Sequence, residues 1–235
     1  MYKDIASVYN ALGWDKFSLK TADKLKPYLK KWRIKNHLDL ACGTGLFVNE
    51  LSRLGIDSSG LDISKEMIAE AKKRFPDRDF YIGDMTCFNF KNKFDLITCL
   101  YDSINHLTTF YKWKKVFQNV YKNLNRGGHF IFDFNTISKM NMARTTTYQT
   151  QPDYLLVVEH KPVGNDRREF FAEWCATSNK NYCVRKKFRV MEKSYPFSKI
   201  KELLAKTGFH EVSLLFTKTK NPDLAPRLFV SARKP

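Results

Sequence analysis

The sequence predicts an α/β fold built on a doubly wound, mostly parallel sheet, and three observations support it. The chain has 235 residues, which is enough to bury the core of one α/β domain. From Leu38 onward, short apolar runs alternate with helical patterns, as in successive βαβ units. Several predicted strands end on a polar or acidic residue, beginning with Asp39 and Asp62, and the carboxyl ends of parallel strands meet at one edge of the sheet.

Residues 38–45 (LDLACGTG) read as a buried strand that enters a turn. Gly43 and Gly45 permit backbone conformations that other residues resist, and they let N–H groups approach a ligand closely. Residues 46–54 follow as a helix whose N-terminus would face that ligand. A G-x-G turn is a weak signal alone, because a tight turn without a ligand has the same pattern.

The second predicted strand, residues 56–62, ends on Asp62, which lies 19 positions after Gly43. At about this spacing a doubly wound sheet presents a carboxylate to ribose hydroxyls. A dinucleotide would place its pyrophosphate near the Asp39 carboxylate, which would repel it, and Val48 stands where a third glycine is preferred. S-adenosylmethionine has no phosphate, and its ammonium can pair with an anion, so the pattern favours this methyl donor.

The other elements of the α/β unit follow from periodicity, caps and breakers. Ser64 can cap a helix that stops before Pro76. The remaining predicted elements are a basic helix over 21–33 that Pro27 interrupts, strands over 80–82, 94–99 and 130–134, and a helix over 113–124. Asp39, Asp62, Asp84, Tyr101, Asp102 and Asp133 are expected along one edge of the sheet.

The pattern changes after residue 154. Extended stretches over 154–160, 168–177 and 182–192 are separated by predicted turns at 164–166 and 178–181, which indicates an inserted antiparallel β meander. A helix over 198–207, with Gly208 as its C-cap, and strands over 212–216 and 228–232 end the chain.

The chain resembles the class I S-adenosylmethionine-dependent methyltransferases at five places that together cover most of residues 1–135. They are Asp39-x-Ala41-x-Gly43-x-Gly45, Asp62, Gly83-Asp84-Met85, residues 94–97 (FDLI) and residues 124–130 (LNRGGHF). The resemblance implies a seven-stranded Rossmann-like sheet with a reversed C-terminal hairpin. It also implies S-adenosylmethionine as cofactor and S-adenosylhomocysteine as product. We expect one methyltransferase domain over 1–235, with an N-terminal lid over 1–20 and an inserted antiparallel lid or substrate subdomain over 150–195.

The same resemblance implies a set of cofactor contacts. Asp39 would bind the methionine ammonium, and Asp62 would bind both ribose hydroxyls. Ile63 and Met85 would enclose the adenine. Asp84 would accept a hydrogen bond from the adenine amino group. The other expected cofactor-binding residues are Ala41, Cys42, Gly43, Gly45, Leu100 and Tyr101.

Residues 98–107 (TCLYDSINHL) are the most informative segment for the methyl acceptor. They lack the Asn/Asp-Pro-Pro-aromatic tetrad of enzymes that methylate amino groups in nucleic acids. Asp102-Ser103-x-Asn105-His106 instead resembles small-molecule methyltransferases, including those that methylate amino groups of nucleotide-linked sugars. This implies Ser103 and Asn105 as acceptor-binding residues.

The predicted catalytic residues are His106, Asp102 and Tyr9. The ordinary pKa of histidine, near 6.5, would let His106 accept a proton from an amine or hydroxyl, although it can also cap the next helix or line a pocket. Asp102 and Tyr101 can bind substrate, contact the methionine end or fix the loop. Tyr9 is the preferred lid contact, although the aromatic residues of segment 1–20 can equally pack on the core.

Charge is the second source of information about partners. The chain has 41 Lys and Arg against 24 Asp and Glu, a net charge of +17, and residues 136–235 carry +10 of it. Arg185, Lys187 and Arg189 would share one face of a strand and could bind the phosphates of a nucleotide-linked acceptor or an RNA. A solvated outer face explains the same residues, so charge alone does not decide.

Other features narrow the class of protein. The N-terminus lacks the apolar run of a signal peptide, and no stretch approaches the roughly 18 apolar residues of a membrane span, so we expect a cytoplasmic protein without a membrane partner. The five cysteines show no metal-type spacing, so reduced thiols and no metal are expected.

The sequence therefore predicts methyl transfer from S-adenosylmethionine to a nitrogen or oxygen of a small, anionic metabolite, by a monomer or homodimer. One alternative is an RNA methyltransferase that uses the basic C-terminal part. The other is a protein that binds S-adenosylmethionine without turning it over.

Overall fold

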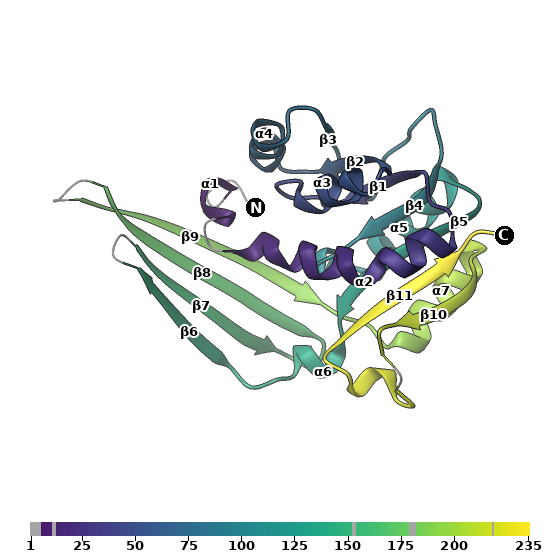
Figure 1. Cartoon of the computed structure of the whole chain (residues 1–235). Coiled ribbons are helices and arrows are strands. Elements are labelled where there is room, and N and C mark those ends of the chain that lie inside the picture. The colour runs from purple at the N-terminus through teal and green to yellow at the C-terminus, as the bar shows by residue number, and fades with distance from the viewer. Residues whose placement is uncertain (1–5, 11–12, 152–153, 179–181, 218) are drawn as a thin grey trace.

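The computed structural model describes residues 6–10, 13–151, 154–178, 182–217 and 219–235. Its centre is a seven-stranded sheet with the strand order β10-β11-β5-β4-β1-β2-β3, and a four-stranded sheet extends from one side of it (Figure 1). The central strands are β1 (Asn36–Leu40), β2 (Asp57–Asp62), β3 (Asp79–Ile82), β4 (Phe94–Cys99), β5 (Leu124–Asn135), β10 (His210–Leu215) and β11 (Arg227–Arg233).

Strand directions in the central sheet agree with the prediction. β3, β2, β1, β4 and β5 pair in parallel, whereas β11 is antiparallel to both β5 and β10. This confirms the doubly wound, mostly parallel sheet with a reversed C-terminal hairpin. The carboxyl ends of β1, β2, β4 and β5 consequently share one edge, where a doubly wound sheet binds its ligands.

Helices cover both faces of this sheet. The longer helices are α2 (Phe17–Lys31), α3 (Leu46–Arg53), α4 (Lys65–Arg74), α5 (Phe110–Asn123) and α7 (Phe197–Thr207). Successive side chains of β5 point to opposite faces: Phe130 and Phe132 are fully buried with residues of α5 and α7, and Ile131 is buried with residues of α2 and α3. Burying each such side chain stabilises the fold by about 1.5–3 kcal/mol.

The N-terminal part is more regular than the sequence indicates. α2 begins at Phe17 and continues through Pro27, so the expected interruption at Pro27 is wrong. Its buried stripe includes Ala22, Leu25 and Leu29, while Pro27 lies on the exposed side. There the missing N–H costs a backbone hydrogen bond but leaves the core contacts intact.

Before α2 the structure describes two short turns of helix, α1 (Ala6–Tyr9) and η1 (Trp14–Lys16). Residues 1–5 and 11–12 of the expected lid lie outside the described residues.

The second sheet is a meander of four antiparallel strands, in the order β6-β7-β8-β9. These are β6 (Thr145–Gln151), β7 (Tyr154–Val163), β8 (Arg167–Ser178) and β9 (Tyr182–Lys193), and the short helix α6 (Ile137–Met140) joins them to β5 (Figure 1). The inserted meander is confirmed, but the sequence did not predict β6. Its sequence TTTYQTQ lacks the apolar alternation of a half-buried strand, and it forms an edge of the sheet.

One face of the four-stranded sheet has a small core of Leu156, Ala172, Phe188 and Val190. Side chains alternate across a strand, so Phe188 and Val190 of β9 point to this face and Arg189, between them, is exposed on the other. The predicted turn at 164–166 joins β7 to β8, whereas the predicted turn at 178–181 lies largely outside the described residues.

The cysteines partly differ from expectation. Cys42, Cys87 and Cys99 are free, but Cys175 is disulfide-bonded, so the expectation of five reduced thiols is wrong. The side chain of Cys183 is outside the described set. No helix in the described part of the chain has the length and apolar character needed to cross a membrane.

Pro27→Ala should raise the free energy of unfolding by about 1–3 kcal/mol, because a proline inside a helix costs about 3 kcal/mol relative to alanine and part of that gain is offset by the freer unfolded chain. Urea titration monitored by circular dichroism measures the change. Lys26→Ala is the matched exposed control on α2. An equal or lower stability of Pro27→Ala would show that α2 does not depend on this position.

Candidate active site

The turn after β1 has an unusual backbone that a neighbouring carboxylate holds in place. Ala41, Gly43 and Gly45 have positive φ angles of 55°, 55° and 80°. The two carboxylate oxygens of Asp62 accept hydrogen bonds from the N–H of Gly43 (2.9 Å) and of Ser64 (2.8 Å). Asp62 therefore ties the end of β2 to the turn after β1.

Gly45 is required for packing. A Cβ atom there would lie 2.4 Å from the Phe80 ring, in addition to the strain of the positive φ. Gly45 is not among the residues that line the cavity described below, so its direct contact with a cofactor, predicted from the sequence, does not follow from the structure.

Asp39 ends a chain of buried polar side chains that sequence reasoning missed. Its carboxylate accepts a hydrogen bond from the Thr98 hydroxyl (2.5 Å), which is 2.8 Å from His37 Nε2, and His37 Nδ1 is 2.7 Å from the Ser58 hydroxyl. Burial lowers the pKa of His37 to about 3, so its ring is neutral. The polar residues within otherwise apolar strands could have indicated this network in the sequence. These hydrogen bonds fix the orientation of the Asp39 carboxylate.

Burial raises the pKa of Asp39 to about 7, an effect that the Thr98 hydroxyl opposes and the nearby Asp62 and Asp133 reinforce. An ionised Asp39 is therefore costly in the empty protein. A cationic group placed beside it would remove that cost.

The turn after β4 is also held in a strained conformation. Tyr101 and Asp102 have positive φ angles of 59° and 50°, which are uncommon outside glycine and small polar residues. The Asp133 carboxylate on β5 accepts hydrogen bonds from both of their N–H groups, at 2.6 and 3.1 Å. Asp133 is fully buried, and burial raises its pKa to about 7 even though Arg227 lowers it.

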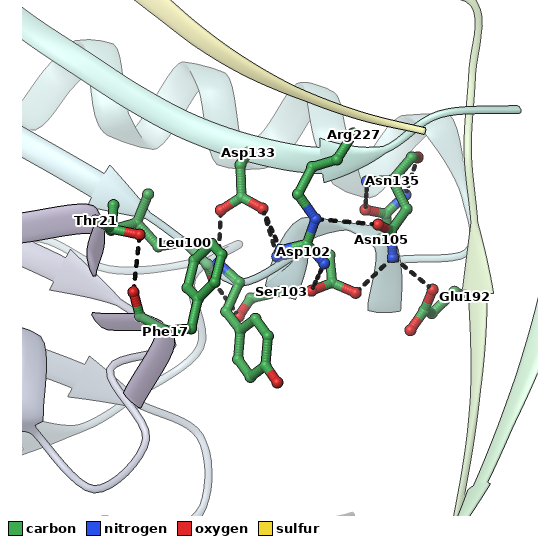
Figure 2. Close-up of polar contacts among 11 residues, drawn as sticks. Phe17, Thr21, Leu100, Asp102, Ser103, Asn105, Asp133, Asn135, Glu192 and Arg227 are labelled. Carbon is green, nitrogen blue, oxygen red and sulfur yellow. Dashed lines mark hydrogen bonds and ion pairs between the residues drawn. The ribbon is translucent and has the colours of Figure 1, made fainter. Parts of the chain in front are cut away.

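Arg227 of β11 connects this turn to the rest of the site (Figure 2). Its guanidinium lies 2.7 Å from the Asp102 carboxylate and 3.0 Å from that of Asp133, and it donates to the Asn135 side-chain oxygen at 3.2 Å. It also lies over the ring of Tyr101, 5.7 Å from the centroid. The Asn135 side-chain N–H₂ donates to Asp102 (2.6 Å) and to Glu192 of β9 (3.1 Å), which joins the two sheets.

A cavity of about 820 Å³ connects the two turns with the inner face of the four-stranded sheet. Among the residues predicted for the site, those that line it are Tyr9, Asp39, Ala41, Cys42, Gly43, Asp62, Ile63, Asp84, Met85, Leu100, Tyr101, Asp102, Ser103 and His106. His106 ends the short helix η2 (Ser103–His106), and burial lowers its pKa. Ile63 is 65% exposed, which leaves an apolar side chain available at the cavity.

The N-terminal segment closes part of this cavity. Asn10 accepts a hydrogen bond from the Thr44 hydroxyl in the turn after β1 (2.6 Å), and Asp15 pairs with Arg74 of α4 (2.7 Å). Trp14 packs edge-on against Phe170 of β8, with ring centroids 5.8 Å apart. Trp14 and Asp15 line the cavity, and neither was predicted as a site residue.

Four residues predicted to bind the acceptor lie elsewhere. Asn105 is fully buried, and its side-chain N–H₂ donates to the backbone carbonyls of Asn135 and Lys193. Arg185, Lys187 and Arg189 are exposed on the outer face of β9, where Arg185 and Arg189 pair with Glu173 and Glu169. The three basic residues do share one face of β9, as predicted, but that face points away from the cavity. Their predicted role in binding the acceptor is therefore corrected.

Within the described residues, no group of three or more His, Cys, Asp and Glu side chains is placed to hold a metal ion.

Residues 38–128 match the family model of a methyltransferase domain. The putative methyltransferase YqeM of Bacillus subtilis is 27% identical over all of this chain and 97% of its own length. A dTDP-3-amino-3,4,6-trideoxy-alpha-D-glucopyranose N,N-dimethyltransferase of Streptomyces venezuelae is 36% identical over 31% of this chain and 30% of its own length.

Solved structures match over nearly the whole chain. An S-adenosylmethionine-dependent methyltransferase from Clostridium acetobutylicum has a TM-score of 0.84 and 23% identity, with 96% of this chain and 98% of that chain covered. Streptomyces venezuelae DesVI has a TM-score of 0.79 and 17% identity, with 99% of each chain covered.

Residues 38–128 thus match a methyltransferase domain, and the whole chain has the Rossmann-like fold of a solved S-adenosylmethionine-dependent methyltransferase.

Arg227→Met should destabilise the protein by about 3–5 kcal/mol, because it leaves the buried Asp102 and Asp133 carboxylates without their cation. Arg233→Met is the matched control, since Arg233 on the same strand forms an exposed pair with Glu211 that should contribute at most about 1 kcal/mol. Denaturant unfolding compares the two variants. Equal losses would mean that Arg227 contributes no more than a surface ion pair.

Proposed function

We propose that this chain is a methyltransferase that uses S-adenosylmethionine as its cofactor and transfers the methyl group to a nitrogen or oxygen of a small molecule bound in the 820 Å³ cavity. The observation that carries the proposal is that one cavity reaches from the turn after β1 to the inner face of the four-stranded sheet. The first region suits a cofactor and the second suits an acceptor. Holding two reactants in one orientation can supply effective molarities of about 10⁵–10⁸ M.

The turn after β1 supports a methionine site. S-adenosylmethionine supplies an electrophilic methyl group when bound. Asp39, oriented by Thr98, would pair with its ammonium, and the backbone of Ala41, Cys42 and Gly43 would contact the methionine portion. These residues fit because Asp39 is a buried carboxylate that faces the cavity and gains from a cationic partner.

The next part of the cavity supports the nucleoside. Asp62 would accept hydrogen bonds from the ribose hydroxyls with the lone pairs not used by Gly43 and Ser64. Ile63 and Met85 would lie on the two faces of the adenine, and Asp84 would accept from its amino group. Leu100 and Tyr101 would complete this wall, since both line the cavity.

The acceptor would lie between the turn after β4 and the four-stranded sheet. His106 would accept a hydrogen bond from the attacking N–H or O–H group, because its lowered pKa keeps the imidazole neutral. Ser103, Asp102 and Tyr9 would position the acceptor from the same side. The similarity to amino-sugar N,N-dimethyltransferases supports a small acceptor with a nucleophilic nitrogen.

The basic residues that the sequence suggested for binding an anionic acceptor do not face the cavity. Arg185, Lys187 and Arg189 face outward, and Arg227 is already paired with two carboxylates. For an anionic group, the cavity offers Lys112 and Lys139.

Asp39→Asn should weaken the binding of S-adenosylmethionine and S-adenosylhomocysteine about 10- to 100-fold, because a hydrogen bond to a charged group contributes about 1.5–3 kcal/mol. Isothermal titration calorimetry measures both ligands. Asp57→Asn is the control, since Asp57 is exposed at the opposite end of β2.

The pH dependence of the same titration tests the charge of Asp39. Below its pKa of about 7 the carboxyl is protonated in the empty enzyme, and binding the ammonium requires it to ionise. The wild-type affinity should therefore fall as pH drops below 7, by up to about tenfold per pH unit, and Asp39→Asn should flatten the profile. The same affinity and profile in both proteins would exclude the assignment of Asp39.

His106→Ala should leave cofactor affinity within about twofold of wild type and lower turnover about 10²- to 10⁴-fold, the range for a group that assists proton movement. Transfer of labelled methyl groups into a pool of small metabolites, measured beside calorimetry with S-adenosylhomocysteine, separates the two effects. Loss of cofactor binding in this variant would place His106 in the cofactor site instead.

A further inference from the structure

A pair of carboxyl groups stands where the two sheets meet, inside the cavity. Glu192 of β9 is 6% exposed and Asp102 is 9% exposed, and both line the cavity. The Asn135 N–H₂ group donates to both side chains, and Asp102 is near enough to raise the pKa of Glu192. Figure 2 shows Glu192 pointing toward Asp102 and Asn135 from the side of the four-stranded sheet.

The two carboxyl groups differ in their access to positive charge. Arg227 lies 2.7 Å from Asp102 and 3.0 Å from Asp133. Among the described residues, no ion pair joins Glu192 to a lysine, arginine or histidine. Arg168 is the register partner of Glu192 on β8, but its terminal nitrogens donate to the backbone carbonyls of Lys139, Met142 and Ala143.

Glu192 is therefore more than nine-tenths buried, faces the cavity and forms no direct ion pair with a described cation, although Arg227 and Arg168 act on it from a greater distance. Burying a carboxylate without a direct ion pair is costly. Burial raises the pKa of Glu192 to about 8, the Asp102 charge adds to the effect, and the hydrogen bond from Asn135 and the charge of Arg227 oppose it. A ligand cation in the cavity would form the direct ion pair that Glu192 lacks and would favour its ionised form.

We propose that Glu192 binds the nitrogen of an amine acceptor and takes the proton that this nitrogen must lose before it can accept a methyl group. The inference rests on the proposed function, which it narrows from nitrogen or oxygen to an amine. It also assigns part of acceptor recognition to β9, on the face opposite Arg185, Lys187 and Arg189.

The proposed step is a single proton transfer. Binding of the acceptor ammonium ionises Glu192, which releases its own proton to water. The ammonium then donates one proton to the Glu192 carboxylate: an N–H bond breaks, an O–H bond forms, and the electron pair of the N–H bond stays on nitrogen as the nucleophilic lone pair. The acceptor loses its positive charge and Glu192 its negative charge, so the buried site holds the same total charge before and after. The hydrogen bonds from Asn135 to Glu192 and Asp102 orient the pair for this transfer.

The test compares Glu192→Gln with the wild type and with Glu169→Gln. Glutamine keeps the shape of the side chain and its hydrogen bond from Asn135 but cannot take the proton. Glu169 lies on β8, pairs with Arg189 on the outer face and does not line the cavity, so its variant controls for loss of a carboxylate from the same sheet.

Calorimetry with S-adenosylhomocysteine comes first, and all three proteins should bind it with affinities within about twofold. Each protein, saturated with S-adenosylhomocysteine, is then titrated with matched amines and alcohols: glucosamine and glucose, and cyclohexylamine and cyclohexanol. Wild type and Glu169→Gln should bind an amine at least about tenfold more tightly than the matched alcohol, and Glu192→Gln should lose this preference. In methyl transfer to a pool of small metabolites, Glu192→Gln should also be reduced about 10²- to 10⁴-fold.

Failure of the inference and failure of the proposed function give different results. If the wild type binds S-adenosylhomocysteine but shows no preference for any amine, or if Glu192→Gln retains the preference or at least a third of the activity, the role of Glu192 is overturned and methyl transfer to another acceptor stands. If the wild type binds no S-adenosylhomocysteine, or transfers methyl groups to no small molecule, the proposed function itself is overturned, and the inference with it.

Discussion

The interaction on which the site depends is the contact of Arg227 with Asp102 and Asp133. Two carboxylates this deeply buried would repel one another and lose their hydration, and a single guanidinium compensates both because its planar fork can donate in several directions. Asp133 is then available to hold the N–H groups of Tyr101 and Asp102, which keeps the turn after β4 in its left-handed conformation. The shape of the cavity floor thus follows from one arginine on the last strand.

The same cluster explains how the two sheets form one cavity. Asn135, at the end of β5, donates to Asp102 of the central unit and to Glu192 of the four-stranded sheet. Asn105 adds a second link, since its N–H₂ group donates to the backbone carbonyls of Asn135 and of Lys193 on β9. Because these groups are buried, an unsatisfied member would be costly, so the inserted sheet is held in one orientation over the cofactor region. Contacts of the N-terminal segment with Thr44, Arg74 and Phe170 close the remaining side.

The charges have different functions in different parts of the molecule. The net charge of +17 suggested an anionic partner, yet the buried groups nearest the proposed reaction centre are mainly carboxylates. Exposed cations such as Arg185 and Arg189 pair with glutamates across the outer face of the four-stranded sheet, where water screens them. The acidic groups face the cavity, where low polarity strengthens their effect on a bound ligand.

The sequence by itself determined the central sheet and its ligand-binding edge. Strand and helix periodicities are local, and parallel strands must end at a common edge, so Asp39, Asp62 and Asp102 could be placed together from their positions after apolar runs. Glycine spacing located the turn after β1 for the same reason. Even so, the sequence did not reveal that Gly45 serves packing against Phe80, because that contact depends on a strand 35 residues later.

Only the tertiary structure decided which side chains complete the site. Arg227 meets Asp102 across 125 positions of sequence, and no local pattern encodes that pairing. In β9 successive side chains point to opposite faces, so Glu192 faces the cavity whereas Lys187 and Arg189 face outward. The sequence of this strand has charged residues on both faces, so it does not show which face is buried. β6 is a strand only because β7 lies beside it. Long-range pairing and the choice of buried face depend on the whole fold, which is why the acceptor region could not be read from the sequence as the cofactor turn could.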